Sequence, residues 1–552
     1  MGYSCLSVKL ALFLHFFLFL GGFAASTQRI PIVDLGYAQY KGSYDPASGY
    51  DTFFGMRFAA PPVGDLRFRA PQPPPPTPQP ALVDASNNSH PGTMCPQGLI
   101  RGRSSPIDVQ LAIPINEDCL TLTVYAPSPH TGPTVQAHNR SFPVVVYFPS
   151  GAYVEGDHSL FHPQRWLDLA DQDVVVVVPN YRVGLFGFLA GEEVYKDGDL
   201  NAGLLDQQFA LKWVQEHIAK FGGDKSKVTI CGHSSGGGSV VQHIISNPTY
   251  PQNNELFINA VPNSPFMPSQ YPYDHKVPTG NYEAILKATG CHGQGLMCLR
   301  KLSTQTLALV NLELCDAGFF GTTPWAPVIE PKGGYIDTPL SVALLNSTGK
   351  LSAHRVLTTH LAWEASVLVN LSMTNGNVTE YVHKLQPSLS PAQVTNLMSI
   401  YPSGEFPSEH ERIASIYQDP VFICPSYLLA MSFSGTGYKG IWNIPPAVHG
   451  QDMGYWLHPG DYHTLPSPET FENYVGGIVS FVRSGDANLF RLNREPGQSN
   501  HLEWPLFDQG MEGLVFNLAD DGVGSKVEAR SMDRKLKERC DFWLSLADVV
   551  GL

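Results

Sequence analysis

The stretch Val228-Thr229-Ile230-Cys231-Gly232-His233-Ser234-Ser235-Gly236 joins a short apolar segment to a G-x-S-x-G motif. Its first four residues are typical of a buried strand, and residues Ser239 to Ile245 predict a helix that follows the motif. A serine in a tight strand-to-helix turn is held in a strained conformation, and flanking glycines let the neighbouring backbone pass. The helix N-terminus stabilises negative charge there. Ser234 is therefore the candidate nucleophile, although the bare motif is weak in a chain with 51 glycines.

The segments on either side of this motif predict a parallel sheet. Val144 to Phe148 and Val174 to Val178 are continuous apolar runs, which suit strands buried on both faces. Leu204 to Phe221 has helical periodicity and ends at Gly222-Gly223. Further strand candidates are His354 to His360 and Gly440 to Ile444. This alternation indicates an α/β fold with helices on the faces of a largely parallel sheet.

The composition is that of a globular chain. Of 552 residues, 43% are hydrophobic and 15% charged, which suffices for a large core. Length alone would allow several domains, but one large sheet can also account for it. The proline-rich stretch Pro71 to Pro80 reads as an extended surface connector that need not separate domains. The net charge of −14, without a block of basic residues, argues against nucleic acid and anionic membranes as partners.

The N-terminus reads as a secretory signal peptide. Lys9 precedes the apolar run Leu10 to Leu20, and Gly22 and Ala24 are small residues at a suitable cleavage spacing. We expect a signal peptide over residues 1–24 and a mature chain over residues 25–552. A membrane anchor is the alternative, but the run is short for a spanning helix. The mature protein is expected to be secreted and extracellular, without a stable membrane anchor.

Two further features fit secretion. Asn-x-Ser/Thr sequons, the acceptors of N-glycosylation, occur at Asn87, Asn139, Asn346, Asn370 and Asn377. Of the nine cysteines, Cys5 would leave with the signal peptide, and disulfides are plausible among the remaining eight.

A serine nucleophile needs oxyanion donors and a base. The backbone N–H of Ser235 is one expected donor, and small residues in the loop Pro149 to Tyr153 would let further N–H groups face a substrate, although an ordinary turn is equally compatible. The base should be a histidine that follows the acid in the chain. Periodicity does not select it among 19 histidines, and His233 is a poor candidate because successive residues at such a turn point apart.

From about Phe53 to the C-terminus, the chain resembles the type-B carboxylesterases, the group that contains cholinesterases, fungal lipases and neuroligins. The motifs that carry the resemblance are Phe54 to Gly64, Glu117 to Leu122, Asn180 to Phe188 and Gly203 to Gln207, in the order of that family. The resemblance implies a single α/β-hydrolase catalytic domain that hydrolyses carboxylic esters through an acyl-serine intermediate, without a metal or organic cofactor.

The resemblance also implies the remaining site residues. Glu364 occupies the place of the family's acid and His449, followed by glycine, that of its histidine; the alternatives are a surface carboxylate and a loop histidine. Backbone N–H groups of Gly151, Ala152 and Ser235 would form the oxyanion hole. The implied disulfides are Cys95 with Cys119, Cys291 with Cys298, and Cys424 with Cys540. Cys231 and Cys315 are left over, and Cys231 is expected to be a buried free thiol.

Several departures from the family argue against a cholinesterase. The oxyanion loop is Pro149-Ser150-Gly151-Ala152-Tyr153 instead of H-G-G-G-F, His233 stands where cholinesterases carry glutamate, and the loop from Cys95 to Cys119 has no tryptophan. Gly321 and Thr323 fall where cholinesterases carry two phenylalanines, which predicts a roomy acyl pocket for medium to long acyl chains.

The substrate class therefore stays partly open. A lipase or sterol esterase is the main alternative, and its lid would be the loop from Cys95 to Cys119, which could equally be a fixed rim. A non-catalytic, neuroligin-like binding protein is disfavoured because the serine and the histidine are present. The partner is expected to be a small-molecule or lipid ester, whereas the natural substrate and the oligomeric state stay open.

Overall fold

The computed structural model describes residues 30–46, 48–75, 82–87, 93–100, 115–128, 141–156, 158, 161–171, 173–247, 255–346, 351–457, 468–490, 502–508, 510–519 and 525–552. The predicted signal peptide, the sequon at Asn139 and most of the segment considered as a lid lie outside the described residues.

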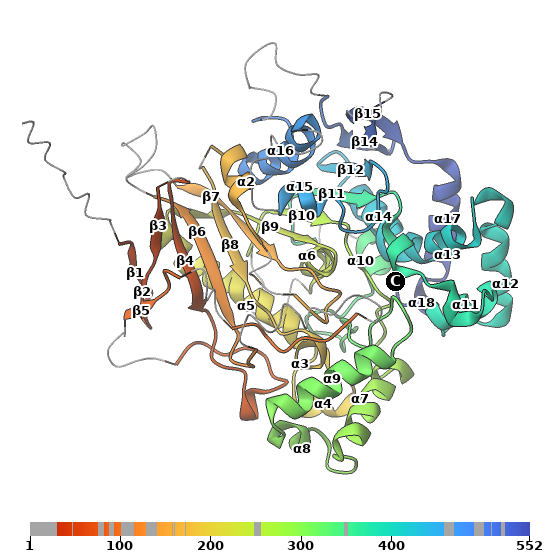
Figure 1. Ribbon diagram of the computed structural model, residues 1–552, viewed down its shortest axis with the longest axis horizontal. Coiled ribbons are helices and arrows are strands. Elements are labelled where there is room, and N and C mark those ends of the chain that lie inside the picture. Colours follow the sequence, from red (N-terminus) through yellow and green to blue (C-terminus); the bar gives the residue numbers. More distant parts are fainter. Residues whose placement is uncertain are drawn as a thin grey trace, which may run out of the picture.

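A large mixed sheet runs through the molecule (Figure 1). In the described chain it contains twelve strands, in the order β15-β14-β12-β11-β10-β9-β7-β8-β6-β4-β3, with β13 paired to β12. A separate small sheet has the order β1-β2-β5. The strands are β1 (Ile32–Asp34), β2 (Gln39–Lys41), β3 (Ser43–Asp45), β4 (Tyr50–Arg57), β5 (Leu82–Asp84), β6 (Thr121–Pro127), β7 (Phe142–Phe148), β8 (Val175–Pro179), β9 (Gly223–His233), β10 (Asn259–Asn263), β11 (Arg355–Leu361), β12 (Gly437–Asn443), β13 (Leu506–Phe507), β14 (Glu512–Leu518) and β15 (Ser525–Ser531).

The centre of the large sheet is parallel and its margins are antiparallel. Strands from β8 through β7, β9, β10, β11 and β12 to β14 pair in parallel, whereas β15, β6, β4 and β3 add antiparallel pairs at the two margins. The sequence predicted the parallel centre correctly. The antiparallel margins were not predicted.

Strand β7 shows why the sequences of the central strands do not alternate between apolar and polar residues. Val144 and Val146 pack in one core together with α5 (Ala202–His217) and α6 (Ser235–Ile245). Val145 and Tyr147 pack in another core together with α2 (Gln164–Leu169) and α16 (Pro468–Ser484). Figure 1 shows these two helical layers on opposite faces of the sheet. Because both faces are covered by helices, both sets of side chains must be apolar.

The helices follow the expected pattern around the sheet. They are α2 (Gln164–Leu169), α3 (Gly184–Phe188), α4 (Glu192–Asp197), α5 (Ala202–His217), α6 (Ser235–Ile245), α7 (Lys276–Thr289), α8 (Gly295–Lys301), α9 (Thr304–Ala317), α10 (Leu340–Leu345), α11 (Val378–Leu385), α12 (Pro391–Ile400), α13 (Glu409–Gln418), α14 (Cys424–Ser432), α15 (Met453–Trp456), α16 (Pro468–Ser484), α17 (Arg534–Ser545) and α18 (Ala547–Val550). The predicted helix Leu204 to Phe221 is split, because a 3-10 turn (Ile218–Phe221) follows α5 before Gly222 adopts a φ of 80°.

A third core joins the sheet to the helices between β10 and α14. It contains residues of the loop after β7, such as Tyr153, together with side chains of α7, α9, α11 and α13. These helices form the lower and right parts of the molecule in Figure 1. The carboxyl ends of the parallel strands therefore face a helical layer, and the space between them is where an α/β fold forms its site.

Three disulfides are present in the described part of the chain, and they join the pairs that the family resemblance implies: Cys95–Cys119, Cys291–Cys298 and Cys424–Cys540. Cys231 and Cys315 are buried free thiols, as expected for Cys231.

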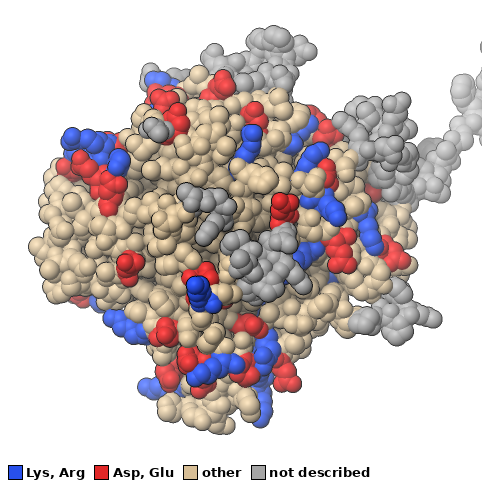
Figure 2. Space-filling model, turned by 180° about the vertical axis from the view of Figure 1, so that it is seen from behind, with Lys and Arg blue, Asp and Glu red and all other residues tan. Residues whose placement is uncertain are grey.

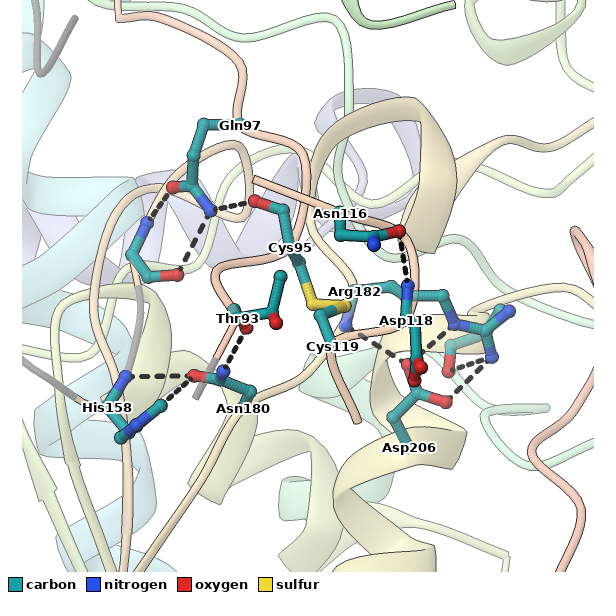
Figure 3. The surroundings of a disulfide bond; sticks show 12 residues. Thr93, Cys95, Gln97, Asn116, Asp118, Cys119, His158, Asn180, Arg182 and Asp206 are labelled. Atoms are coloured by element: carbon teal, nitrogen blue, oxygen red, sulfur yellow. Dashed lines mark hydrogen bonds and ion pairs between the residues drawn. A yellow bond between two sulfur atoms is a disulfide. The ribbon is translucent and has the colours of Figure 1, made fainter. Parts of the chain in front are cut away.

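The first disulfide sits in a dense polar network (Figure 3). Gln97 Nε2 donates to the Cys95 carbonyl at 2.7 Å, and Gln97 Oε1 accepts from the Gly156 N–H at 2.5 Å. The neighbouring Arg182 and Asp206 form a buried ion pair at 2.7 Å. Gln97 therefore ties the Cys95 end of the loop to Gly156, and ion pairs of Glu117 with Arg67 and of Asp118 with Arg57 hold its Cys119 end.

The surface carries charges of both signs. On the face in Figure 2, acidic and basic side chains are interspersed and do not separate into large patches of one sign. Within the described ranges, the helices are too short or too polar for any of them to cross a bilayer.

Candidate active site

Ser234 occupies the turn between β9 and α6 in a backbone conformation with φ 55° and ψ −124°. Glycines are required beside it. A Cβ at Gly232 would collide with the backbone of Gly236, and a Cβ at Gly236 would collide with the carbonyl of Phe148. The Ser234 N–H donates to the Asn263 carbonyl at 3.0 Å, which ties the turn to β10. The motif therefore requires glycine at both of its ends, because other backbone segments lie too close to Gly232 and Gly236 to leave room for a Cβ.

His449 and Glu364 meet Ser234 at the carboxyl edge of the sheet. His449 Nε2 lies 2.8 Å from Ser234 Oγ, and His449 Nδ1 lies 2.6 Å from Glu364 Oε2. Glu364 follows β11 and His449 follows the neighbouring β12; the preceding residues, Trp363 and Val448, form an isolated parallel bridge. That bridge extends the pairing of β11 and β12 beyond their ends and places the acid beside the histidine.

Glu364 is held in a dry environment. Its side chain has 0% exposure, and its Oε1 accepts the Leu361 N–H at 2.7 Å. Burial raises the pKa of Glu364 to about 7, while the Leu361 N–H, the Ser264 hydroxyl and the charge of Lys439 act in the opposite direction. A carboxylate bonded to His449 Nδ1 favours the imidazole tautomer whose Nε2 is a hydrogen-bond acceptor, and this Nε2 faces Ser234 Oγ.

Two of the candidate oxyanion donors, Gly151 and Ala152, line the same cavity as Ser234. Gly151 and Ala152 lie in the loop after β7 with φ of 133° and 53°, and Ser235 is the first residue of α6. Among the described residues, the N–H groups of Gly151 and Ala152 donate no hydrogen bond. Gly151 cannot carry a Cβ, since Glu155 backbone atoms occupy that position. The altered loop therefore keeps N–H groups available beside the serine.

A cavity of about 270 Å³ opens over Ser234. Its wall includes Gly151, Ala152, Gly321, Thr323, Phe422 and His449. A second cavity of about 410 Å³ adjoins it and shares Phe266 and Thr323. In the described residues, no three potential ligand side chains gather as a metal site would require.

Some residues of this site were not identified from the sequence. The Phe422 ring lies 4.7 Å from the His449 ring, and the buried Asp452 faces His233. Lys439 is fully buried, with its Nζ 2.5 Å from His360 Nδ1. Asp452 lies three residues after His449, so its position in the sequence could have suggested it. Nothing in the sequence around Lys439 distinguishes it from a surface lysine.

This fold and this arrangement define a serine ester hydrolase of the α/β-hydrolase class. The Carboxylesterase family matches residues 29–543, and the chain belongs to that family. The chain is 29% identical to Carboxylesterase patB of Aspergillus clavatus, over 94% of this chain and 97% of the relative. It is 35% identical to Lipase 2 of Diutina rugosa, over 86% and 89% of the two chains. The crystal structure of Aspergillus niger EstA superimposes with a TM-score of 0.79 at 27% identity, covering 95% of this chain and 99% of EstA.

Proposed function

We propose that the chain is a secreted carboxylic ester hydrolase in which Ser234 is the nucleophile, His449 the general base and Glu364 the acid. The observation that carries the proposal is the pair of contacts at His449, 2.8 Å to Ser234 Oγ and 2.6 Å to Glu364 Oε2. These three side chains come from three separate turns at the carboxyl ends of β9, β11 and β12.

The chemistry follows from these contacts. His449 Nε2 takes the proton of Ser234 as Oγ attacks the ester carbonyl, and Glu364 stabilises the imidazolium that forms. The N–H groups of Gly151, Ala152 and Ser235 receive the oxyanion, and the helix N-terminus of α6 adds to its stabilisation. His449 then gives its proton to the leaving alcohol. Water, activated by the same histidine, hydrolyses the acyl-serine.

The test compares the purified protein with its Ser234→Ala variant on p-nitrophenyl butyrate. Ser399→Ala, a change at an exposed serine in α12, is the matched control. We expect turnover by the wild type and the control, and a loss of kcat of at least about a thousandfold in S234A. Full activity of S234A would refute the proposed nucleophile, and inactivity of the folded wild type would refute the proposed hydrolysis.

We further propose that the acyl side accepts medium to long chains. Gly321 and Thr323 line the cavity over Ser234 and offer little bulk there. The adjoining cavity at Phe266 and Thr323 provides further apolar space. A steep fall in kcat/KM from acetyl to hexanoyl esters would contradict this preference.

A lipase is the second candidate, favoured by the likeness to Lipase 2 of Diutina rugosa and to a protein named "Secreted lipase" of Arthroderma benhamiae. A lid between Cys95 and Cys119 would produce interfacial activation on emulsified triglyceride. Activity that does not rise above the solubility limit of the substrate would favour the esterase and a fixed rim.

Secretion is supported by the exposure of the sequons. Asn87, Asn346, Asn370 and Asn377 are exposed, so glycans could be attached without disturbing the core. We expect the expressed protein to leave the cell, to begin near residue 25, and to lose mass on treatment with an N-glycosidase. An N-terminal sequence that starts at Met1 would refute the proposed signal peptide.

A further inference from the structure

The loop after β7, which carries two of the candidate oxyanion donors, is hydrogen-bonded to residues 95–100. Gln97 Oε1 accepts the Gly156 N–H at 2.5 Å, and Gln97 Nε2 lies 3.4 Å from the Gly156 carbonyl oxygen. The next residue, Gly98, donates its N–H to the Val154 carbonyl at 2.5 Å. The start of the disulfide loop is therefore attached to the far side of the turn that presents the donors.

That turn holds its residues in an unfavourable backbone conformation. Ala152 and Tyr153 follow one another with φ of 53° and 63°. Residues with a side chain rarely adopt such values, and each does so at a cost in free energy. Gly156 closes the turn, because a Cβ there would collide with the Ser150 carbonyl oxygen. Such a conformation persists where surrounding contacts enforce it, and the Gln97 side chain supplies contacts of this kind at the closing residue.

Gln97 is itself held on its other side. It is 4% exposed, and its Nε2 donates to the Cys95 carbonyl at 2.7 Å (Figure 3). The backbone carbonyl of Gln97 accepts from Asn311 Nδ2 at 3.0 Å, and Asn311 is fully buried in α9. Cys95 is fixed in turn by its disulfide to Cys119. The amide that grips Gly156 therefore has anchors in a helix and beside a disulfide, which restrict its movement.

These contacts lie in the wall of the candidate site. Gln97 and Gly156 line the cavity over Ser234, together with Gly151 and Ala152. An oxyanion donor accelerates the reaction only if its N–H points at the place where the negative charge develops. A displacement of about 1 Å in such a group can cost about a hundredfold in rate. The support of this loop is therefore a catalytic requirement as well as a structural one.

We propose that Gln97 is a positioning residue that holds the N–H groups of Gly151 and Ala152 in the geometry that receives the oxyanion. The proposal rests on the proposed nucleophile and oxyanion donors. Gln97 acts through the Gly156 peptide group and takes no part in bond formation or proton transfer. The oxyanion exists in the transition state and not in the bound ester, so loss of Gln97 should lower kcat and leave KM nearly unchanged.

Gln97→Met tests the proposal, because methionine fills a similar volume but cannot hydrogen-bond the Gly156 peptide as the amide does. We expect kcat on p-nitrophenyl butyrate to fall by about a hundredfold, with KM within about twofold of the wild type. Gln97→Asn is the second variant and is used if Q97M does not fold. Its side chain is one methylene shorter and cannot span from the Cys95 carbonyl to Gly156, so the same change is expected.

Inhibition by an alkyl trifluoromethyl ketone separates positioning from folding. Ser234 Oγ adds to the ketone carbonyl and passes its proton to His449, and the resulting hemiketal oxyanion occupies the oxyanion hole. We expect the inhibition constant to rise by about the same factor as kcat falls. Partial misfolding lowers the amount of active enzyme but does not change the inhibition constant of the folded fraction.

Gln215→Met is the matched control. Gln215 lies in α5, outside the cavity wall, and its Nε2 also donates to two backbone carbonyls, at 2.9 and 3.0 Å. The variant loses a comparable set of hydrogen bonds but should keep the kcat, the KM and the inhibition constant of the wild type.

Three outcomes would overturn the proposal: an unchanged kcat in the Gln97 variants, a loss of kcat/KM that arises from KM alone, or an inhibition constant that stays constant while kcat falls. Failure of the triad itself would appear differently, as turnover by S234A or no turnover by the wild type.

Discussion

His449 Nδ1 lies 2.6 Å from Glu364 Oε2, and this carboxyl group has no exposed surface. The bond depends on the pairing of β11 with β12, since Trp363 and Val448 bridge immediately before the two side chains. This bridge therefore helps to orient the imidazole, although His449 itself lies in the turn beyond the end of β12.

Glu364→Gln tests this orientation. The amide keeps the shape of the side chain but removes its charge, and it can present an N–H to His449 Nδ1, which favours the wrong tautomer. We expect kcat to fall by roughly a thousandfold to ten-thousandfold with little change in KM. Steady-state kinetics beside Glu313→Gln, at an exposed glutamate of α9, measure the effect. A loss below about tenfold would argue that Glu364 is not the acid.

Gly236→Ala should abolish the nucleophile turn. The added methyl group would meet the Phe148 carbonyl, so either β7 or α6 must move. We expect loss of activity and a lowered Tm, measured by thermal melts and p-nitrophenyl butyrate hydrolysis. Gly280→Ala is the control: Gly280 lies within α7, where a Cβ meets nothing, and alanine should stabilise the helix by about 1 kcal/mol. Comparable damage from both changes would contradict the steric argument.

Thr323→Phe should shorten the accepted acyl chain. Thr323 borders both cavities, and a phenyl ring there would take up space at their shared wall. We expect the kcat/KM ratio of decanoyl to butyryl esters to fall by about tenfold or more, in line with the selectivity that hydrophobic pockets achieve. The chain-length profile of p-nitrophenyl esters is the measurement. An unchanged ratio would place the acyl chain elsewhere in the cavity.

Glu330 should make stability depend on pH. Burial raises its pKa to about 7, above its ordinary value of 4.5. The folded protein thus binds this proton more tightly than the unfolded chain, so the contribution is complete below about pH 4.5 and is lost as the pH rises through about 7. In Glu330→Gln, the fall in Tm between these two pH values should become smaller. A slope identical to that of the wild type would contradict the role assigned to Glu330.

The sequence predicted the elements whose signals are local. Val174 to Val178 lies in β8 apart from its first residue, and the strand and helix around Ser234 occur where the motif required them. Strands at the antiparallel margin, such as β4, were missed. They owe their stability to partners far along the chain, as β4 does to β6, and local composition does not reveal such pairing.

The candidate site also combines local and long-range signals. Ser234 could be predicted from the local motif of its turn. Glu364 and His449 are separated from it by more than a hundred residues, and only the order of the strands in the sheet brings them to it. Family resemblance, not periodicity, supplied those two positions. The contacts of His233 with Asp452 and of Lys439 with His360 arise entirely from tertiary packing, and they appear only in the folded arrangement.

Cys231 can serve as a probe of local unfolding at the centre of the sheet. Its thiol is buried in β9, three residues before Ser234, and burial raises its pKa well above the ordinary range. The folded protein should therefore resist thiol reagents at this position, and modification would occur only when the centre of the sheet opens. The labelling rate of Cys231 would then measure how often the native protein opens locally at β9, the strand that carries Ser234 at its end.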